Sequence, residues 1–135
     1  MTKKITIAFL ILVLIQALHS IEEYMGKLWE VFPPARFFCS LISNDLENGF
    51  LIANISLFVI GIVVWLIPVR KNYPVAKSFI WFWIVIEMIN GIGHPAWALY
   101  EWSYTPGVIT APFLLILAIY LAREMSKNNL QTEMK

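Results

Sequence analysis

The sequence predicts an all-α membrane protein, folded as a bundle of four transmembrane helices. Of its 135 residues, 59% are hydrophobic and only 14% are charged, against about 25% charged in an ordinary soluble domain. The mean hydropathy is +0.70, and four long apolar runs are separated by short stretches that contain proline or charge. Because so few charged side chains could not cover four such runs in water, we expect a single transmembrane domain over residues 1–135.

The first predicted span covers residues 5–24. Two lysines precede an apolar run that ends at Leu18 and contains Gln16 as its only strongly polar side chain. Such a start resembles a secretory signal peptide. Cleavage requires small residues at both the −3 and −1 positions, and no site at the end of the run has this pair. We therefore expect a retained helix, long enough at about 1.5 Å per residue to cross the ~30 Å hydrocarbon layer.

Residues 25–48 predict an interfacial loop or short helix between the first and second spans. The Pro33-Pro34 pair prevents a continuous helix through this segment, and aromatic side chains near the pair are typical of membrane interfaces. A short helix is expected after the second proline. Asn44 or Asp45 is the expected N-cap of the helix that follows.

Three further spans are predicted, at residues 50–67, 76–94 and 106–122. The second span carries no charge and stops at Pro68, whereas the third carries Glu87 within its apolar sequence. Pro106 is expected in the first turn of the fourth helix, where its missing N–H costs nothing. Residues 123–135 are predicted to form a polar tail that frays.

The basic residues predict the orientation of these spans. If both termini lie on the inner side, eight of the ten lysines and arginines are inside and only Lys27 and Arg36 are outside. Such an excess of basic residues is typical of cytoplasmic loops. The sequence thus predicts a multi-pass, N-in, C-in protein of the plasma membrane. The net charge of +1 gives no reason to expect a nucleic-acid partner.

Polar side chains gather at the outer end of the predicted bundle. Two sets occupy neighbouring positions on one helix face of the first and third spans: His19, Glu22 and Glu23, and Glu87, Asn90 and His94. Tyr104, Pro106 and Gly107 stand on the same side, where the fourth span is expected to begin. Ionisable groups inside a membrane segment face the bundle interior and mark functional sites. We therefore expect these groups to share one pocket.

A mononuclear metal site is one hypothesis for this pocket. Histidine nitrogens with carboxylate oxygens suit zinc or non-haem iron, so His19, Glu23 and His94 are the expected ligands of a divalent metal ion. Glu22 would then orient a ligand or act as a general base, and Asn90 would hold a substrate oxygen or support a ligand. The sequence contains no CxxC, Walker, GxGxxG or HExxH motif.

A metal-free acid–base site is the other hypothesis. In it His19 pairs with a glutamate to act as the base, and Asn90 and Tyr104 polarise a carbonyl or phosphoryl group. Plainer interpretations also stay open, with Asn90 as a contact between helices and Tyr104 as part of an interfacial aromatic belt. Pro106 and Gly107 are expected to shape the turn and bring the backbone close to the site.

Three motifs give the chain a resemblance to the HXXEE family of small membrane proteins. They are His19-Ser20-Ile21-Glu22-Glu23, Asn90-Gly91-Ile92-Gly93-His94 and Tyr104-Thr105-Pro106-Gly107. The resemblance covers nearly the whole chain and implies an integral membrane enzyme of unknown reaction. It implies these signature positions: His19, Glu22, Glu23, Asn90, His94, Tyr104, Pro106 and Gly107. The resemblance implies no substrate or cofactor. Glu87 lies outside the three motifs, and we include it among the candidate site residues from its helical phase alone.

Two classes of function follow from this sequence. The first is an enzyme, metal-dependent or acid–base, that acts on a lipid-like or amphiphilic substrate entering from the outer leaflet. The second is a small proton- or cation-coupled transporter, for which Glu87 is the intramembrane carboxylate. We rank the enzyme first because most of the polar residues lie nearer the surface than a transporter site at the midplane. A tight bundle has little room, so a site shared with lipid or between the protomers of a homodimer is left open.

Overall fold

The protein is all-α, as the sequence predicts, in a computed structural model that describes residues 1–133, with side chains to residue 128. The elements are α1 (Lys3–Met25), α2 (Leu28–Val31), α3 (Pro33–Ile42), α4 (Leu46–Val64), the π-helical turn η1 (Trp65–Val69), α5 (Ala76–Glu101) and α6 (Ala111–Glu133). No strand occurs within residues 1–133.

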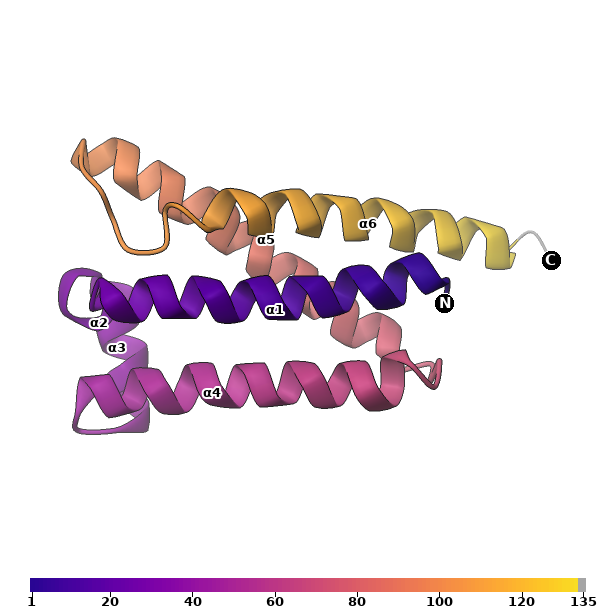
Figure 1. Ribbon diagram of the computed structural model, residues 1–135, viewed down its shortest axis with the longest axis horizontal. Helices are drawn as coiled ribbons and strands as arrows, with labels where there is room; N and C mark the ends of the chain where they lie inside the picture. The colour runs from indigo at the N-terminus through magenta and orange to yellow at the C-terminus, as the bar shows by residue number, and fades with distance from the viewer. Residues whose placement is uncertain (134–135) are drawn as a thin grey trace.

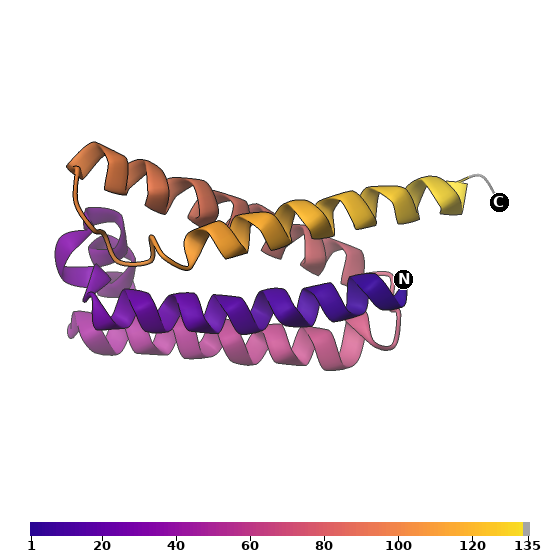
Figure 2. The ribbon, with the colours of Figure 1, turned by 45° about the horizontal axis from the view of Figure 1, so that its top comes forward.

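The four long helices run lengthwise, and α1 is central to their packing (Figure 1). It packs against α4 on one side and α6 on the other, while α6 is the main partner of α5. Figure 2 shows α1 and α4 as a close pair that α5 and α6 cover obliquely. The short helices α2 and α3 close the end of the bundle that lies opposite the two termini.

Three of these helices are long and apolar enough to cross a membrane. They are α1, α4 with its extension through η1 (Leu46–Val69), and α5. Large apolar side chains such as Ile55 and Val59 project outward from α4, as expected for a surface that faces lipid rather than water. α6 is not among the three, and in its sequence Arg123 and Glu124 follow the apolar part.

The helix ends differ from the predicted ones at two places near the site. α5 does not stop at His94 but continues through Pro95 to Glu101. A proline within a helix lacks an N–H and its ring crowds the carbonyl four residues earlier, yet membrane-type helices tolerate this. The predicted start of the fourth helix at Pro106 is replaced by Ala111, so residues 102–110 form an irregular connection.

The remaining helix ends lie close to the predicted ones, except at the C-terminus. Asp45, one of the two predicted N-caps, precedes α4, and its side chain accepts a hydrogen bond from the backbone N–H of Asn48. The expected short helix after the proline pair is α3. The predicted polar tail is helical as far as Glu133; its last residues, 134–135, lie outside the described part of the chain.

Two apolar clusters flank the polar residues of α1. The larger cluster fills the bundle between α1, α5 and α6 and includes Phe9, Trp83 and Leu114. The smaller cluster packs α2 and α3 onto α4 and includes Trp29 and Phe50. The part of α1 that follows the larger cluster carries the predicted site, which therefore lies near the end closed by α2 and α3.

Candidate functional site

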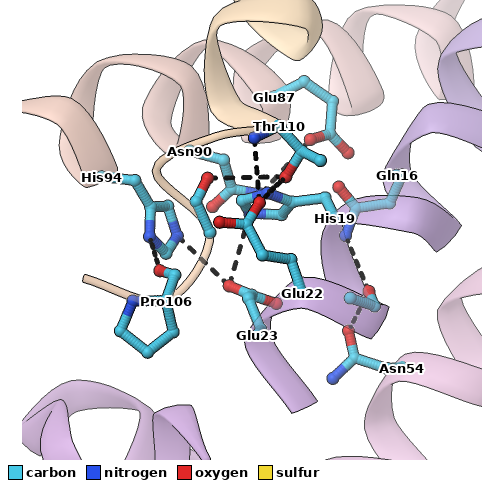
Figure 3. A network of polar contacts seen from close by, with 12 residues as sticks. Gln16, His19, Glu22, Glu23, Asn54, Glu87, Asn90, His94, Pro106 and Thr110 are labelled. Atoms are coloured by element: carbon cyan, nitrogen blue, oxygen red, sulfur yellow. Dashed lines mark hydrogen bonds and ion pairs between the residues drawn. The ribbon is translucent and has the colours of Figure 1, made fainter. Parts of the chain in front are cut away.

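Two imidazole rings and one carboxylate meet at the end of the bundle near α2 and α3 (Figure 3). The ring centroids of His19 on α1 and His94 on α5 are 4.7 Å apart, and the rings are nearly perpendicular. The Oε1 atom of Glu23 lies 3.4 Å from Nε2 of His19 and 3.2 Å from Nε2 of His94. All three side chains are buried. One carboxylate oxygen is therefore shared between two histidines from different helices.

A backbone carbonyl fixes the tautomer of His94. The Nδ1 atom lies 2.7 Å from the carbonyl oxygen of Pro106, and a carbonyl oxygen can only accept a hydrogen bond. The proton of the neutral ring therefore resides on Nδ1, and Nε2 carries a lone pair that faces Glu23. The connection between α5 and α6 thus determines which nitrogen of His94 is available.

A hydroxyl fixes the tautomer of His19 in the same way. The Nδ1 atom lies 2.7 Å from Oγ1 of Thr110, and the Thr110 hydroxyl donates its single proton to Oε2 of Glu22 at 2.6 Å. The hydroxyl must then accept from Nδ1–H of His19. Consequently Nε2 of the neutral His19 ring also carries a lone pair, and it has no hydrogen-bond partner in the described part of the chain.

Glu22 binds the connection between α5 and α6 rather than the two rings. It accepts hydrogen bonds from the backbone N–H groups of Ile109 (3.0 Å) and Thr110 (2.9 Å) and from the hydroxyl of Tyr104 (3.1 Å). Burial and the bond to Glu22 raise the pKa of Tyr104, although its side chain is largely exposed. The two adjacent glutamates of α1 therefore have different surroundings, Glu22 in the connection and Glu23 between the rings.

Pro106 and Gly107 bring the backbone of this connection against the rings. Gly107 has a positive φ of 89°, which favours glycine. A Cβ atom on Gly107 would lie 2.7 Å from atoms of both His19 and His94. A Cβ on Gly26, just after α1, would lie 2.5 Å from the Pro106 ring. Pro106 and Gly107 thus pack directly on the two histidines, and Pro106 also packs against the end of α1.

Glu87 belongs to a neighbouring polar group, deeper in the bundle. It is fully buried, and Asn90 donates to its Oε2 at 3.2 Å. The side-chain amide of Gln16, with its nitrogen turned toward Glu87, donates to the two carboxylate oxygens at 2.9 and 2.7 Å, and its oxygen lies 3.3 Å from the Ser20 hydroxyl. Ser20 in turn donates to Asn54 on α4 at 2.7 Å. Polar side chains of α1, α4 and α5 are joined in this way.

The structure divides the predicted site residues into three sets. His19, Glu23 and His94 meet directly, whereas Glu22, Tyr104, Pro106 and Gly107 hold the connection beside them. Asn90 bonds to Glu87 rather than to a histidine. The catalytic and metal-binding roles assigned from the sequence stay predictions.

Sequence reasoning missed Thr110 and underrated Gln16. Thr110 carries no motif, and its contact with His19 depends on the irregular path of residues 102–110, which no periodicity reveals. The sequence could have indicated a role for Gln16, because a lone amide inside an apolar helix needs a buried hydrogen-bond partner. Glu87 is that partner.

The chain matches one described protein family. The match covers residues 10–121, and the family is described as "Protein of unknown function with HXXEE motif". No curated protein and no solved structure shows significant similarity to the chain. The matched region contains all three motifs and every residue of the site. The protein therefore belongs to the HXXEE family.

Proposed function

We propose that this protein is an integral membrane enzyme that holds a divalent transition-metal ion between His19, Glu23 and His94. One observation carries the proposal. Hydrogen bonds to Thr110 and Pro106 leave Nε2 of both rings, in their neutral form, as lone-pair donors, and both donors face one carboxylate oxygen. Three electron-rich atoms this close in a buried site repel one another unless a metal cation lies among them or the rings take up protons.

The donor atoms fit a metal ion in type, and so do the two spacings between nitrogen and oxygen. One ligand atom from each of the three residues lies within 4.8 Å of the others. The distances of 3.4 and 3.2 Å between the nitrogens and the carboxylate oxygen are close to the ~3.3 Å between two ligands of a tetrahedral ion bound at about 2.0 Å. Two histidines and one carboxylate are a ligand set of catalytic zinc and of non-haem iron.

The surrounding contacts suit ligands of a catalytic ion. Thr110 and Pro106 accept the Nδ1–H protons of the two rings, which holds each ring with Nε2 forward. Glu22 anchors Thr110 and so supports His19 indirectly. A bound divalent ion would supply Lewis-acid activation of a carbonyl or phosphoryl oxygen, or of a water molecule.

The membrane placement of this enzyme completes the proposal. Three membrane-type helices support a multi-pass protein, and we propose α6 as the fourth span in an N-in, C-in arrangement in the plasma membrane. The apolar part of α6 is short, so neighbouring lipid or a second copy of the chain would help to cover it. The site then lies in the outer half of the bilayer, within reach of a lipid-like substrate.

Elemental analysis of the purified protein tests the metal directly. The wild type is expected to contain about one zinc or iron per chain, and His19→Ala and His94→Ala are expected to lose it because each removes one of three ligands. Thr105→Val is a control, because the Thr105 hydroxyl has no hydrogen bond in the described part of the chain. Folded wild-type protein that binds no added metal would overturn the metal centre and favour metal-free acid–base chemistry.

A small proton-coupled transporter is the second candidate, and one observation favours it. Glu87 is fully buried, and its hydrogen bonds in the described part of the chain come from two neutral amides, an arrangement that suits reversible protonation. Proton uptake into proteoliposomes with a fluorescent pH indicator tests this function. Substrate-dependent uptake that Glu87→Gln abolishes would favour the transporter over the enzyme.

A further inference from the structure

A cavity of about 200 Å³ lies beside Glu23 and is lined by residues of α1, α2, α3, α4 and α5. Its polar lining comes from Glu23, Gln16, Asn54 and Asn90. The rest of its lining is apolar or weakly polar and includes Phe38, Cys39, Ile42, Ala53 and Leu57. The cavity therefore has a polar side and an apolar side, as a binding site for an amphiphile would. The polar side lies next to the proposed metal ligands.

The polar side of the cavity offers hydrogen-bond acceptors. Both histidines contact Oε1 of Glu23, and Oε2 has no hydrogen bond within the described residues. Asn90 uses its nitrogen to donate to Glu87, which leaves its side-chain oxygen as an acceptor. Two acceptors, one of them a carboxylate, favour a head group that donates hydrogen bonds and disfavour one that carries negative charge.

The apolar side of the cavity reaches the surface of the bundle. Phe38 and Ile42 line the cavity from α3, yet they are 64% and 46% exposed. Leu57 lines it from α4, a helix whose outward side chains are apolar. The cavity also contacts Asn90 on α5, so it lies between the two sides of the bundle that α1 joins. A hydrocarbon chain could therefore enter from surrounding lipid without crossing water.

We propose that this cavity binds the substrate of the site, a single-chain amphiphile whose head is a hydroxyl or amine. The head would donate to Glu23 and Asn90, and the first part of the chain would lie against Ala53 and Leu57. The small volume argues against two acyl chains, because ordinary ligand pockets hold about 300–1,000 Å³. This inference rests on the proposed function, since it supplies the substrate of the same site.

Photolabelling in lipid nanodiscs tests the assignment. The probe is a long-chain alcohol with a diazirine on its alkyl chain, and mass spectrometry identifies the labelled residues. We expect labelling of Phe38, Ile42 and Leu57, and competition by an unlabelled alcohol or amine but not by the fatty acid of equal length. Labelling confined to outward residues of α4, or stronger competition by the acid, would overturn the proposal.

A matched pair of variants separates the cavity from the outer surface. Ala53→Phe fills the cavity, whereas Ile52→Phe adds a similar ring at a neighbouring outward position. We expect Ala53→Phe to reduce labelling of Leu57 about tenfold, as about 1.4 kcal/mol of lost binding would do, and Ile52→Phe to leave it unchanged. Equal labelling of both variants would overturn the proposal.

Cys39 provides a second measurement on the unmodified protein. It is the only cysteine, it is buried, and it lines the cavity. Burial, together with the nearby Glu23 carboxylate, raises the pKa of the thiol, so alkylation with N-ethylmaleimide is followed at alkaline pH. The long-chain alcohol is expected to slow this alkylation severalfold, and an unchanged rate at saturating alcohol would overturn the proposal.

The metal content of the same samples distinguishes this inference from the proposed function. Ala53→Phe is expected to retain metal, because residue 53 lies outside the three ligands. A metal-loaded wild type that the probe does not label in the cavity overturns the substrate assignment alone. A metal-free wild type that is still labelled there overturns the proposed metal centre and supports amphiphile binding by itself.

Discussion

The Oε1 atom of Glu23 lies 3.2 Å from Nε2 of His94, although the two residues belong to different helices and are far apart in the sequence. The same oxygen faces His19, one turn earlier on α1. Because Pro106 fixes the proton of His94 on Nδ1, the contact brings a lone pair toward a carboxylate. This relationship is the basis of the metal-binding proposal, and it makes Glu23 the first residue to test.

Glu23→Gln is expected to abolish stoichiometric metal binding. The substitution keeps the size of the side chain but removes the negative charge and offers a neutral amide in place of a metal ligand. Elemental analysis after purification in the presence of zinc measures the loss. Glu101→Gln, at the exposed end of α5, should retain metal. Full occupancy in Glu23→Gln would show that the carboxylate is not a ligand.

Thr110→Val is expected to lower metal affinity about 10–100-fold, the usual effect of removing a group that orients a metal ligand. Valine keeps the shape of threonine but removes the hydroxyl that accepts from His19 and donates to Glu22. Competition with a chromogenic chelator gives the affinity. Thr105→Val serves as the control, because it removes a buried hydroxyl that has no hydrogen bond in the described part of the chain and should leave affinity unchanged.

Gly107→Ala is expected to destabilise the protein by about 1–3 kcal/mol. The added methyl group would lie 2.7 Å from both rings, at a backbone φ of 89° that disfavours alanine. Gly93→Ala is the matched control, because a Cβ at Gly93 meets no atom within 4 Å, and removing a helical glycine stabilises by about 0.5–1 kcal/mol. Thermal unfolding in detergent compares the two, and equal melting temperatures would contradict the close contact.

The hydroxyl of Tyr104 is expected to ionise above the ordinary tyrosine range. Burial raises its pKa first, and the hydrogen bond to Glu22 raises it further. Because the folded pKa exceeds the unfolded one, this bond stabilises the protein below the unfolded pKa and is lost as pH rises through the folded pKa. The phenolate absorbance of the wild type, measured against pH, minus that of Tyr104→Phe gives the titration of Tyr104. Tyr100→Phe, which removes a strongly exposed phenol, is the control. An ordinary or lowered midpoint for Tyr104 would contradict the bond.

The sequence could predict the parts of the site that depend on helical spacing. His19 and Glu23 are one turn apart, so any helix through this segment brings them together. Predicting that His94 lies close to His19 needed a further step. It required that the first and third spans run in the same direction and end at the same depth. Hydropathy and the basic residues supplied that step, and the two rings do lie side by side.

The parts that could not be predicted depend on irregular backbone. Pro95 looked like a helix end, but α5 continues past it, and Pro106 looked like a helix start, but it lies in the connection. The contact of Thr110 with His19 follows from that path alone. Asn90 illustrates the limit of helical phase, because it shares a face with both Glu87 and His94 and bonds only to Glu87 among the described residues.

The close packing of Pro106 against Gly26 links two parts of the chain mechanically. Pro106 also holds His94 through its carbonyl oxygen, so a displacement of this proline would release the ring and loosen the junction between α1 and α2 together.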